Sequence, residues 1–189
     1  MKKIIGKFLP LLIIVILVSI ACNLPVGGAA APQRTIEVSA QAAQSAMETI
    51  ENSADQLVQG ATVTITLTEE QLTSLLATQI ENSADSSLSN PQVLIENGKI
   101  LIYGTMDQGL ISTNVIFTLA VVKDTSGKSS IQLESLDLGQ LPAPQSLLDS
   151  LSNYVNSTIA AALNQSANGY EILDLVVEGD TLSITVRKN

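Results

Sequence analysis

Residues 61–80, ATVTITLTEEQLTSLLATQI, carry two different hydrophobic patterns in direct succession. The first part alternates strictly between threonine and an apolar residue, which is typical of a half-buried strand. Thr68 is then followed three residues later by Gln71, a capping box that begins a helix. We therefore predict a strand over 61–67 that runs directly into a helix. The side chains expected on the apolar faces are Val63, Ile65 and Leu67 in the strand, and Leu72, Leu75, Leu76 and Ile80 in the helix.

Most of the chain beyond this helix is predicted to be antiparallel sheet. Asn97-Gly98 is the signal of a type I′ hairpin turn. The expected strands cover residues 92–96, 99–106, 110–123, 129–138, 170–177 and 181–188. Within 129–138, Ile131 and Leu133 are out of phase with Leu136 and Leu138, and this slip indicates a bulge.

Two further helices are expected, one on each side of the sheet-forming region. The pattern over 38–59 predicts a helix with a thin apolar stripe, and the pattern over 145–165 predicts a long helix with a continuous one. The first stripe consists of Ala43, Met47, Ile50, Ala54 and Leu57, and the second of Leu147, Leu148, Leu151, Val155, Ile159, Ala162 and Leu163. Antiparallel strands interrupted by a few helices indicate an α+β domain.

The N-terminus has the pattern of an export signal. Three lysines precede an uncharged apolar run of 14 residues, Phe8–Ala21, which is short for a membrane-spanning helix. The following Cys22 and the small residue before it resemble the lipobox of bacterial lipoproteins, although Ser19 departs from that pattern. The resemblance implies cleavage after residue 21 and acylation of Cys22. The alternative is an uncleaved anchor, and both predict a tethered protein on the extracytoplasmic side of a cell membrane.

Composition and charge limit the classes of partner. The chain has 189 residues, 18 acidic and 9 basic. Loss of the three lysines of the signal would leave six basic groups and a net charge of −12, which makes nucleic acid an improbable ligand. The expected organisation is a signal peptide over 1–21, a lipidated cysteine and flexible tether over 22–35, a peripheral helix over 36–60 and one domain over 61–189.

The residues offer little for catalysis. Without histidine, and with its single cysteine predicted to be acylated, the chain has no metal-ligand cluster or histidine-based triad. Paired acids such as Glu69 with Glu70, or Asp174 with Glu178, are expected to be solvated surface groups. We therefore predict a non-enzymatic protein with neither cofactor nor metal.

The order of elements resembles that of the YpmS-like and LmeA-like envelope proteins, which are related to the tubular lipid-binding (TULIP) superfamily. The resemblance covers about residues 61–188 and rests on the helix start at 68–76, the hairpin at Asn97-Gly98, the segment Leu-Pro-Ala-Pro at 141–144 and the last hairpin. It implies a curved antiparallel sheet of about six strands packed on one long helix, with a second, shorter helix and a lipid in the gap.

The site that this resemblance and the apolar pattern suggest is a groove between the long helix and the sheet. Its expected lining residues are Phe117, Leu119, Leu148, Leu151, Val155, Ile159 and Leu163. The alternative is that these side chains form an ordinary packed core, with the protein serving as an envelope scaffold for an unknown protein partner.

Overall fold

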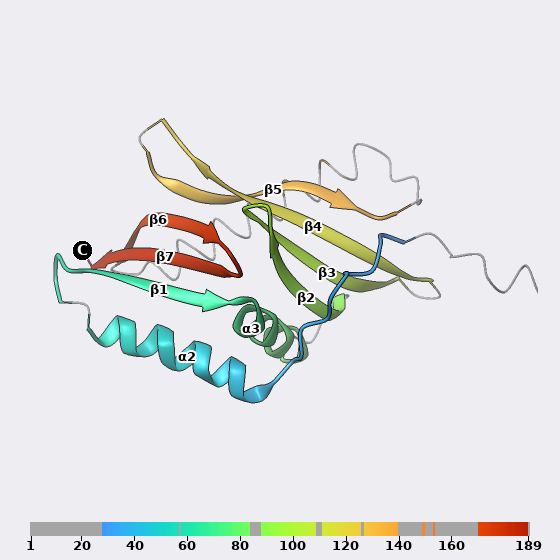
Figure 1. Ribbon diagram of the computed structural model, residues 1–189, viewed down its shortest axis with the longest axis horizontal. Helices are drawn as coiled ribbons and strands as arrows, with labels where there is room; N and C mark the ends of the chain where they lie inside the picture. The colour runs from blue at the N-terminus through green and yellow to red at the C-terminus, as the bar shows by residue number, and fades with distance from the viewer. Residues whose placement is uncertain are drawn as a thin grey trace, which may run out of the picture.

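The computed structural model describes residues 28–56, 58–83, 88–108, 111–125, 127–139, 149, 153 and 170–188. Within these ranges, two complete helices and seven strands follow one another (Figure 1). They are α2 (Ala40–Asp55), β1 (Thr62–Thr68), α3 (Glu69–Glu81), β2 (Leu88–Glu96), β3 (Lys99–Gln108), β4 (Ile111–Lys123), β5 (Ser129–Asp137), β6 (Tyr170–Glu178) and β7 (Thr181–Lys188). The predicted α+β class is confirmed.

The strands divide between two antiparallel sheets. Sheet A has the order β1-β7-β6 and sheet B has the order β2-β3-β4-β5. Among the described strands, no backbone ladder joins β5 of sheet B to β6 of sheet A. The two sheets are linked by side chains instead: Asp174 of β6 accepts a hydrogen bond from Ser129 of β5 and forms an ion pair with Lys123 of β4. The single curved sheet of about six strands is therefore not confirmed.

The junction between β1 and α3 forms as its sequence predicts. Thr68 is the N-cap of α3, and both hydrogen bonds of the capping box with Gln71 are present. The expected apolar face is only partly buried: Leu72 and Leu76 pack on the core. The most deeply buried residues of α3 are instead Glu69, Thr73, Ser74 and Ala77.

These buried residues face the free edge of sheet B. The Thr73 hydroxyl accepts a hydrogen bond from the backbone N–H of Val93 at 2.9 Å, and the Glu69 carboxylate accepts one from the N–H of Ile95 at 2.5 Å. Strand β2 is the outermost strand of its sheet, so these amides have no strand partner. Helix α3 thus covers an edge that would otherwise carry unpaired backbone groups.

Helix α2 buries only part of the predicted stripe. Ala43 is buried as expected, whereas Met47 and Ile50 are 48% and 38% exposed. Ala42 and Ala46, which lie outside the stripe, are buried instead. The reason is the contact with α3, where Gln71 donates to Ser45 and the backbone N–H of Ser39 donates to Ser74. Small side chains allow the two helices to approach closely, so alanine rather than methionine occupies the interface.

Turns and bulges in sheet B follow the local sequence. Asn97 and Gly98 have φ values of 54° and 73°, which are the positive values that a type I′ turn requires. The predicted bulge lies at Glu134, because Thr118 pairs with Ser135 whereas the next residue, Leu119, pairs with Leu133. One residue of β5 is left unpaired, and the apolar phase changes there.

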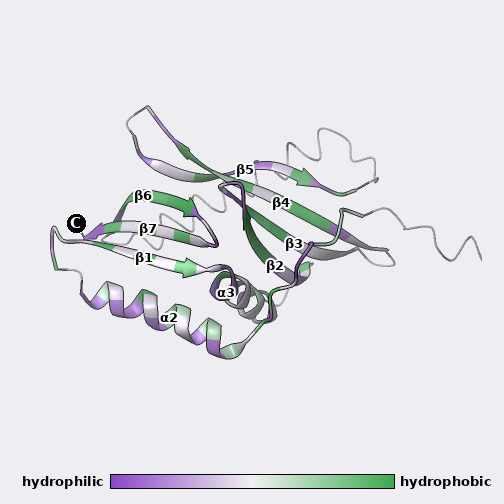
Figure 2. Ribbon diagram, viewed as in Figure 1, coloured by the Kyte–Doolittle hydropathy of each residue, from purple (hydrophilic) through white to green (hydrophobic). Residues whose placement is uncertain are grey.

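Both sheets contribute one face to a common core. Sheet B supplies the buried residues Val93, Ile95, Ile100, Leu119 and Leu133, and sheet A supplies Leu182. Figure 2 shows the most hydrophobic colours along β2, β3, β4 and β6, whereas α2 is mainly neutral to hydrophilic. The core therefore lies between the sheets and α3, and the described helices contact β1 and β2.

The last hairpin, β6 to β7, turns at Gly179 and Asp180 as predicted. The predicted long helix over 145–165 lies outside the described residues except for two positions. Asp149 and Asn153 are helical and exposed, and they are four residues apart.

Candidate functional site

The predicted lipid site is described only on its sheet side. Leu119 is buried in the core cluster, and Phe117, two residues away on the same face of β4, is partly buried against it. The expected helix residues Leu148, Leu151, Val155, Ile159 and Leu163 lie outside the described residues, as does Cys22. The sheet half of the predicted groove is thus apolar and contiguous.

This apolar face extends over both sheets. The side chains that pack against the cluster without being fully buried come from α3, sheet B and sheet A: Leu72, Leu76, Ile102, Phe117, Ile131, Val177 and Ile184. Register places Ile102 opposite Phe117, and Val177 opposite Leu182. Apolar side chains of two neighbouring sheets therefore form one surface, which we call the core face.

A buried carboxylate, that of Glu69, lies at the β2 edge of sheet B. Glu69 is 4% exposed, and both of its oxygens accept hydrogen bonds from the Arg34 guanidinium. These hydrogen bonds raise the pKa of Arg34, and the charges of Glu96 and Asp180 act in the same direction. The prediction that Glu69 is a solvated surface acid is wrong, because the half-exposed Arg34, 35 residues away in sequence, pairs with the carboxylate and covers it. Glu70 is exposed as expected.

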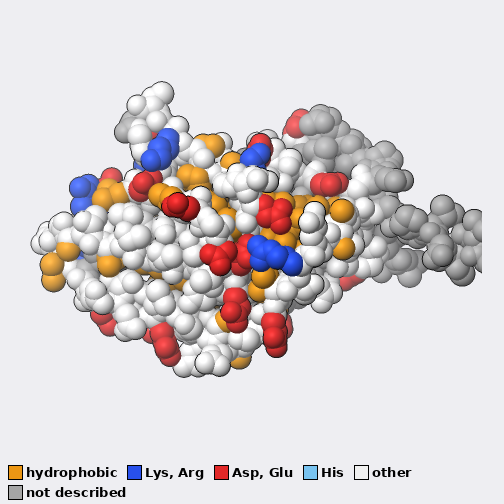
Figure 3. All heavy atoms as spheres, viewed as in Figure 1, with side chains coloured by type: hydrophobic (Ala, Val, Ile, Leu, Met, Phe, Trp, Pro, Cys, Tyr) orange, Lys and Arg blue, Asp and Glu red, His pale blue; other side chains and the backbone are white. Residues whose placement is uncertain are grey.

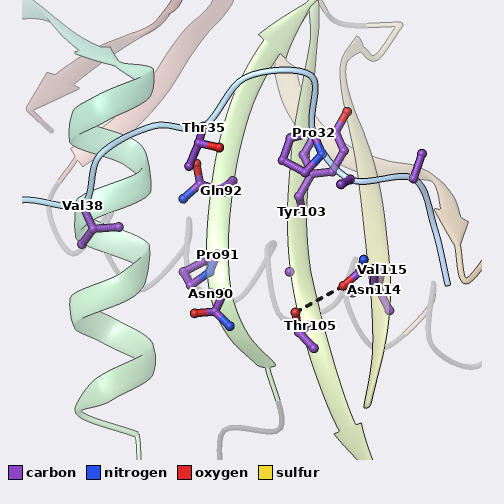
Figure 4. A pocket seen from close by; sticks show the side chains of 13 residues that line it. Pro32, Thr35, Val38, Asn90, Pro91, Gln92, Tyr103, Thr105, Asn114 and Val115 are labelled. Atoms are coloured by element: carbon purple, nitrogen blue, oxygen red, sulfur yellow. Dashed lines mark hydrogen bonds between the residues drawn. The ribbon is translucent and has the colours of Figure 1, made fainter. Parts of the chain in front are cut away.

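Arg34 belongs to a segment, Gly28–Ser39, that crosses the outer side of sheet B and that we call the strap (Figures 1 and 4). The backbone N–H of Ala29 donates to the carbonyl of Asn114 at 2.9 Å, and that of Ile36 donates to the Gln92 side chain at 2.5 Å. Residues 28–35 were expected in the flexible tether. In the structure two of them, Ala29 and Arg34, are bonded to the domain, and the adjoining Ile36 forms the next attachment.

Glycine permits the first of these attachments. A Cβ on Gly28 would lie 2.7 Å from the backbone nitrogen of Asn114. A Cβ on Gly139 would overlap the carbonyl group of Gly28. Two chain segments cross here in backbone contact, and side chains at either position would separate them.

Beneath the strap lies a pocket of about 350 Å³, the strap pocket (Figure 4). The strap forms one wall, and β2, β3 and β4 form the other. Its lining residues are Ala30, Ala31, Pro32, Thr35, Val38, Asn90, Pro91, Gln92, Tyr103, Gly104, Thr105, Asn114 and Val115. Gln92 is paired with Tyr103, and Thr105 with Asn114, on the face opposite the core face. The apolar site and the strap pocket thus lie on opposite sides of one sheet.

Charged groups are distributed over the surface rather than collected at either site. Figure 3 shows acidic side chains at separate places on the visible face, with a few basic ones beside them. Where the sheets meet, the hydrogen bond from Ser129 and the ion pair with Lys123 lower the pKa of Asp174. Among the described residues no three histidine, cysteine or acidic side chains are grouped as metal ligands would be. Neither described helix has the length and hydrophobicity to cross a bilayer.

The chain matches no protein-family model, no curated protein and no solved structure.

Sequence reasoning overlooked the strap pocket. One local signal was present, because Asn90-Pro91 interrupts what is otherwise strand sequence, and proline inside a strand is typical of an edge or a bulge. The register of β2 against β3 does shift between Ser89 and Gln92. No local signal indicated that the strap would lie over this bulge.

Proposed function

We propose that the protein is a non-catalytic, membrane-anchored lipoprotein on the extracytoplasmic side that binds a lipid or similar amphiphile on its core face. The observation that carries this proposal is the continuous apolar surface shared by the two sheets. It is built from aliphatic side chains and Phe117, and several of them stay partly exposed. Flexible acyl chains are matched by aliphatic walls that can adapt to them.

The connection between the sheets supports an enclosed site. Strand β5 ends at Asp137 in sheet B, and β6 begins at Tyr170 in sheet A, so the intervening chain must pass from one sheet to the other. This is the segment in which the sequence predicts the long apolar helix. The described helices make most of their contacts with β1 and β2, although Leu72 and Leu76 of α3 also pack on the core cluster. We place the predicted helix over β4, β5 and β6. A helix lying over a curved pair of sheets would also match the arrangement implied by the TULIP resemblance.

The polar positions of the predicted helix agree with that placement. Asp149 and Asn153 are exposed and lie four residues apart, on one side of a helix. The apolar stripe, which contains Leu151 and Val155, would then be directed to the core face. The acyl chains of the ligand would lie between this stripe and Phe117.

The strap supports attachment close to the membrane. Because Gly28 and Ala29 contact Asn114, only residues 23–27 separate the domain from the predicted lipid anchor at Cys22. Six Cα-to-Cα steps reach at most about 20 Å. The binding face would therefore stay within reach of the bilayer from which the ligand is taken.

Native mass spectrometry combined with lipid extraction tests this proposal on the protein beginning after Cys22 and expressed in bacteria. The expected result is a reproducible excess mass that is lost in Phe117→Trp, which fills the core face. The neighbouring Thr118→Trp is the matched control, because its side chain is on the opposite face of β4. Leu151→Trp with Val155→Trp should act like Phe117→Trp if the predicted helix closes the groove. A protein that stays free of lipid after incubation with membrane extract would contradict the proposal.

A scaffold function is the alternative, and one observation favours it. Val38, Met47, Ile50 and Val58 are exposed apolar side chains on or beside α2. Met47 and Ile50 lie three residues apart on one face of α2, and neighbouring exposed apolar side chains of this kind can mark a protein contact. Retention of a protein partner by the lipid-free domain, lost in Met47→Lys and kept in Phe117→Trp, would support a scaffold instead of a lipid carrier.

A further inference from the structure

The strap pocket differs chemically from the rest of this acidic protein because none of its lining residues is charged. Its polar groups are three carboxamides, two threonine hydroxyls and one phenol, contributed by Asn90, Gln92, Asn114, Thr35, Thr105 and Tyr103. Burial raises the pKa of the Tyr103 phenol, and Glu96 adds to that effect. The phenol therefore remains a neutral donor and acceptor over the physiological range.

Part of this polar capacity is unused within the protein. The Gln92 side-chain oxygen accepts from Ile36, which leaves its amide N–H groups without a partner among the described residues. The side chains of Thr35, Asn90 and Tyr103 likewise make no hydrogen bond to any residue in the described part of the chain. Every fully buried side-chain nitrogen or oxygen there does have a partner. The unpaired groups of the pocket are thus accessible and available to a ligand.

Backbone geometry at the pocket wall is specialised. Asn90 has a φ of 50°, one of two non-glycine residues with a positive φ in the described chain. The other, Asn97, lies in a hairpin turn that requires such a value. Asn90 lies in the bulge of β2 beside the buried Pro91, where no turn requires it. Asparagine adopts this left-handed conformation more readily than most residues, and here it brings a carboxamide to the pocket wall.

The apolar part of the lining is made of small groups and one ring. Alanine, proline and valine side chains and the ring of Tyr103 offer flat contacts, and Figure 4 shows the strap carrying Pro32 across β3 at Tyr103. A volume of about 350 Å³ is near the lower limit for small-molecule sites, about 300 Å³. The ligand must therefore be compact and uncharged, with an apolar surface bordered by hydrogen-bonding groups.

We propose that the strap pocket binds a neutral sugar carrying an acetamido group. The ring hydroxyls would exchange hydrogen bonds with Asn90, Thr35 and the Gln92 amide. The acetamido methyl would contact the alanine and proline walls. A neutral sugar also avoids the repulsion that an anion would meet at a protein of net charge −9. This site lies on the opposite side of sheet B from the proposed lipid site, and neither proposal depends on the other.

Saturation-transfer NMR tests the proposal, with N-acetylglucosamine as the probe and the full chain in a phosphocholine detergent that has no sugar headgroup. We expect saturable binding to the unmodified protein. Asn90→Gly removes the carboxamide but tolerates the positive φ, so it should weaken binding at least tenfold without unfolding β2. Ala31→Trp should abolish binding by filling the pocket from the strap.

The control for Ala31→Trp is Gln33→Trp, which places the same bulky group on an exposed strap position that does not line the pocket. It should bind the sugar like the unmodified protein. Circular dichroism on each variant establishes that its strands are intact. Absence of binding to the unmodified protein at the highest soluble sugar concentration would overturn the proposal. So would binding that persists unchanged in both Asn90→Gly and Ala31→Trp, because the sugar would then lie elsewhere.

Discussion

The two faces of β2, β3 and β4 are built on opposite principles. On the core face, Val93, Ile102 and Phe117 lie in register across the three strands and pack against other apolar side chains. One residue along, Gln92 and Tyr103 face a strap and a pocket whose polar groups are partly unpaired. Strand alternation alone separates the two surfaces. A single sheet can therefore combine an apolar site and a polar site that do not interfere with each other.

The largest loss of stability should come from shortening a buried side chain on the core face. Leu119→Ala removes a buried side chain of the cluster and should reduce the free energy of unfolding by about 2–5 kcal/mol. Thr118→Ala, on the opposite face, should cost less than about 1 kcal/mol. Urea denaturation followed by circular dichroism measures both. Equal losses would mean that the two faces of β4 do not differ as described.

The strap side should be held by its ion pair. Arg34→Ala leaves the buried Glu69 without its cation and should destabilise the protein by about 1–3 kcal/mol. It should also speed hydrogen exchange at the amides of Ala29 and Ile36, which attach the strap. The control is Arg187→Ala, whose partner Glu171 is on the surface; that change should cost less than about 1 kcal/mol. Unchanged exchange in Arg34→Ala would show that the ion pair does not hold the strap.

The contact between the sheets should respond to acid. The pKa of Asp174 is lowered in the folded protein, so its contribution to stability is present above pH of about 4 and is lost as the pH falls through the folded value. Thermal unfolding at pH 6 and pH 3 should show Asp174→Asn less stable than the unmodified protein at pH 6, with a smaller difference at pH 3. Ser129→Ala removes the hydrogen bond that lowers the pKa of Asp174 most. This variant should reduce the pH dependence of stability while leaving the charge of Asp174 in place. If the difference in stability between Asp174→Asn and the unmodified protein were larger at pH 3 than at pH 6, the stabilising role of the Asp174 carboxylate would be contradicted.

The smallest effect is expected on α2, outside both faces. Met47 is 48% exposed, so Met47→Gln should change the free energy of unfolding by no more than about 0.5 kcal/mol. Ala46, one residue earlier, has no exposed surface, and Ala46→Gln should be clearly more destabilising. Urea titrations of the two variants compare them directly. If Met47→Gln were the more destabilising of the two, Met47 would belong to the buried face of α2, as the sequence predicts.

Local features of the fold could be predicted because neighbouring residues determine them. The capping box at Thr68 and Gln71, the turn at Asn97 and Gly98 and the bulge at Glu134 depend on residues within a few positions of one another. Alternation also identified the core-face position of Phe117. These elements agree with the sequence because their hydrogen bonds and dihedral angles are short-range.

Features created by distant contacts could not be read in the same way. Glu69 resembles a solvated acid until Arg34, on a segment expected to be a flexible tether, neutralises it. Met47 and Ala46 are equally plausible on a buried helix face, and only the close approach of α3 selects alanine. The division into two sheets depends on β5 and β6 meeting through side chains instead of a backbone ladder. The strap pocket likewise depends on a distant contact, because residues 30–38 line it together with β2, β3 and β4.

The most direct test of lipid binding on the core face is photocrosslinking with a phospholipid that carries a diazirine in its acyl chain, followed by peptide mapping. Binding on the core face predicts adducts on β4 at Phe117 and on the segment 145–165, and no adducts at Thr118 or on the strap. Adducts confined to the strap side, or to Met47 and Ile50 of α2, would place the acyl chains outside the core face and contradict the account.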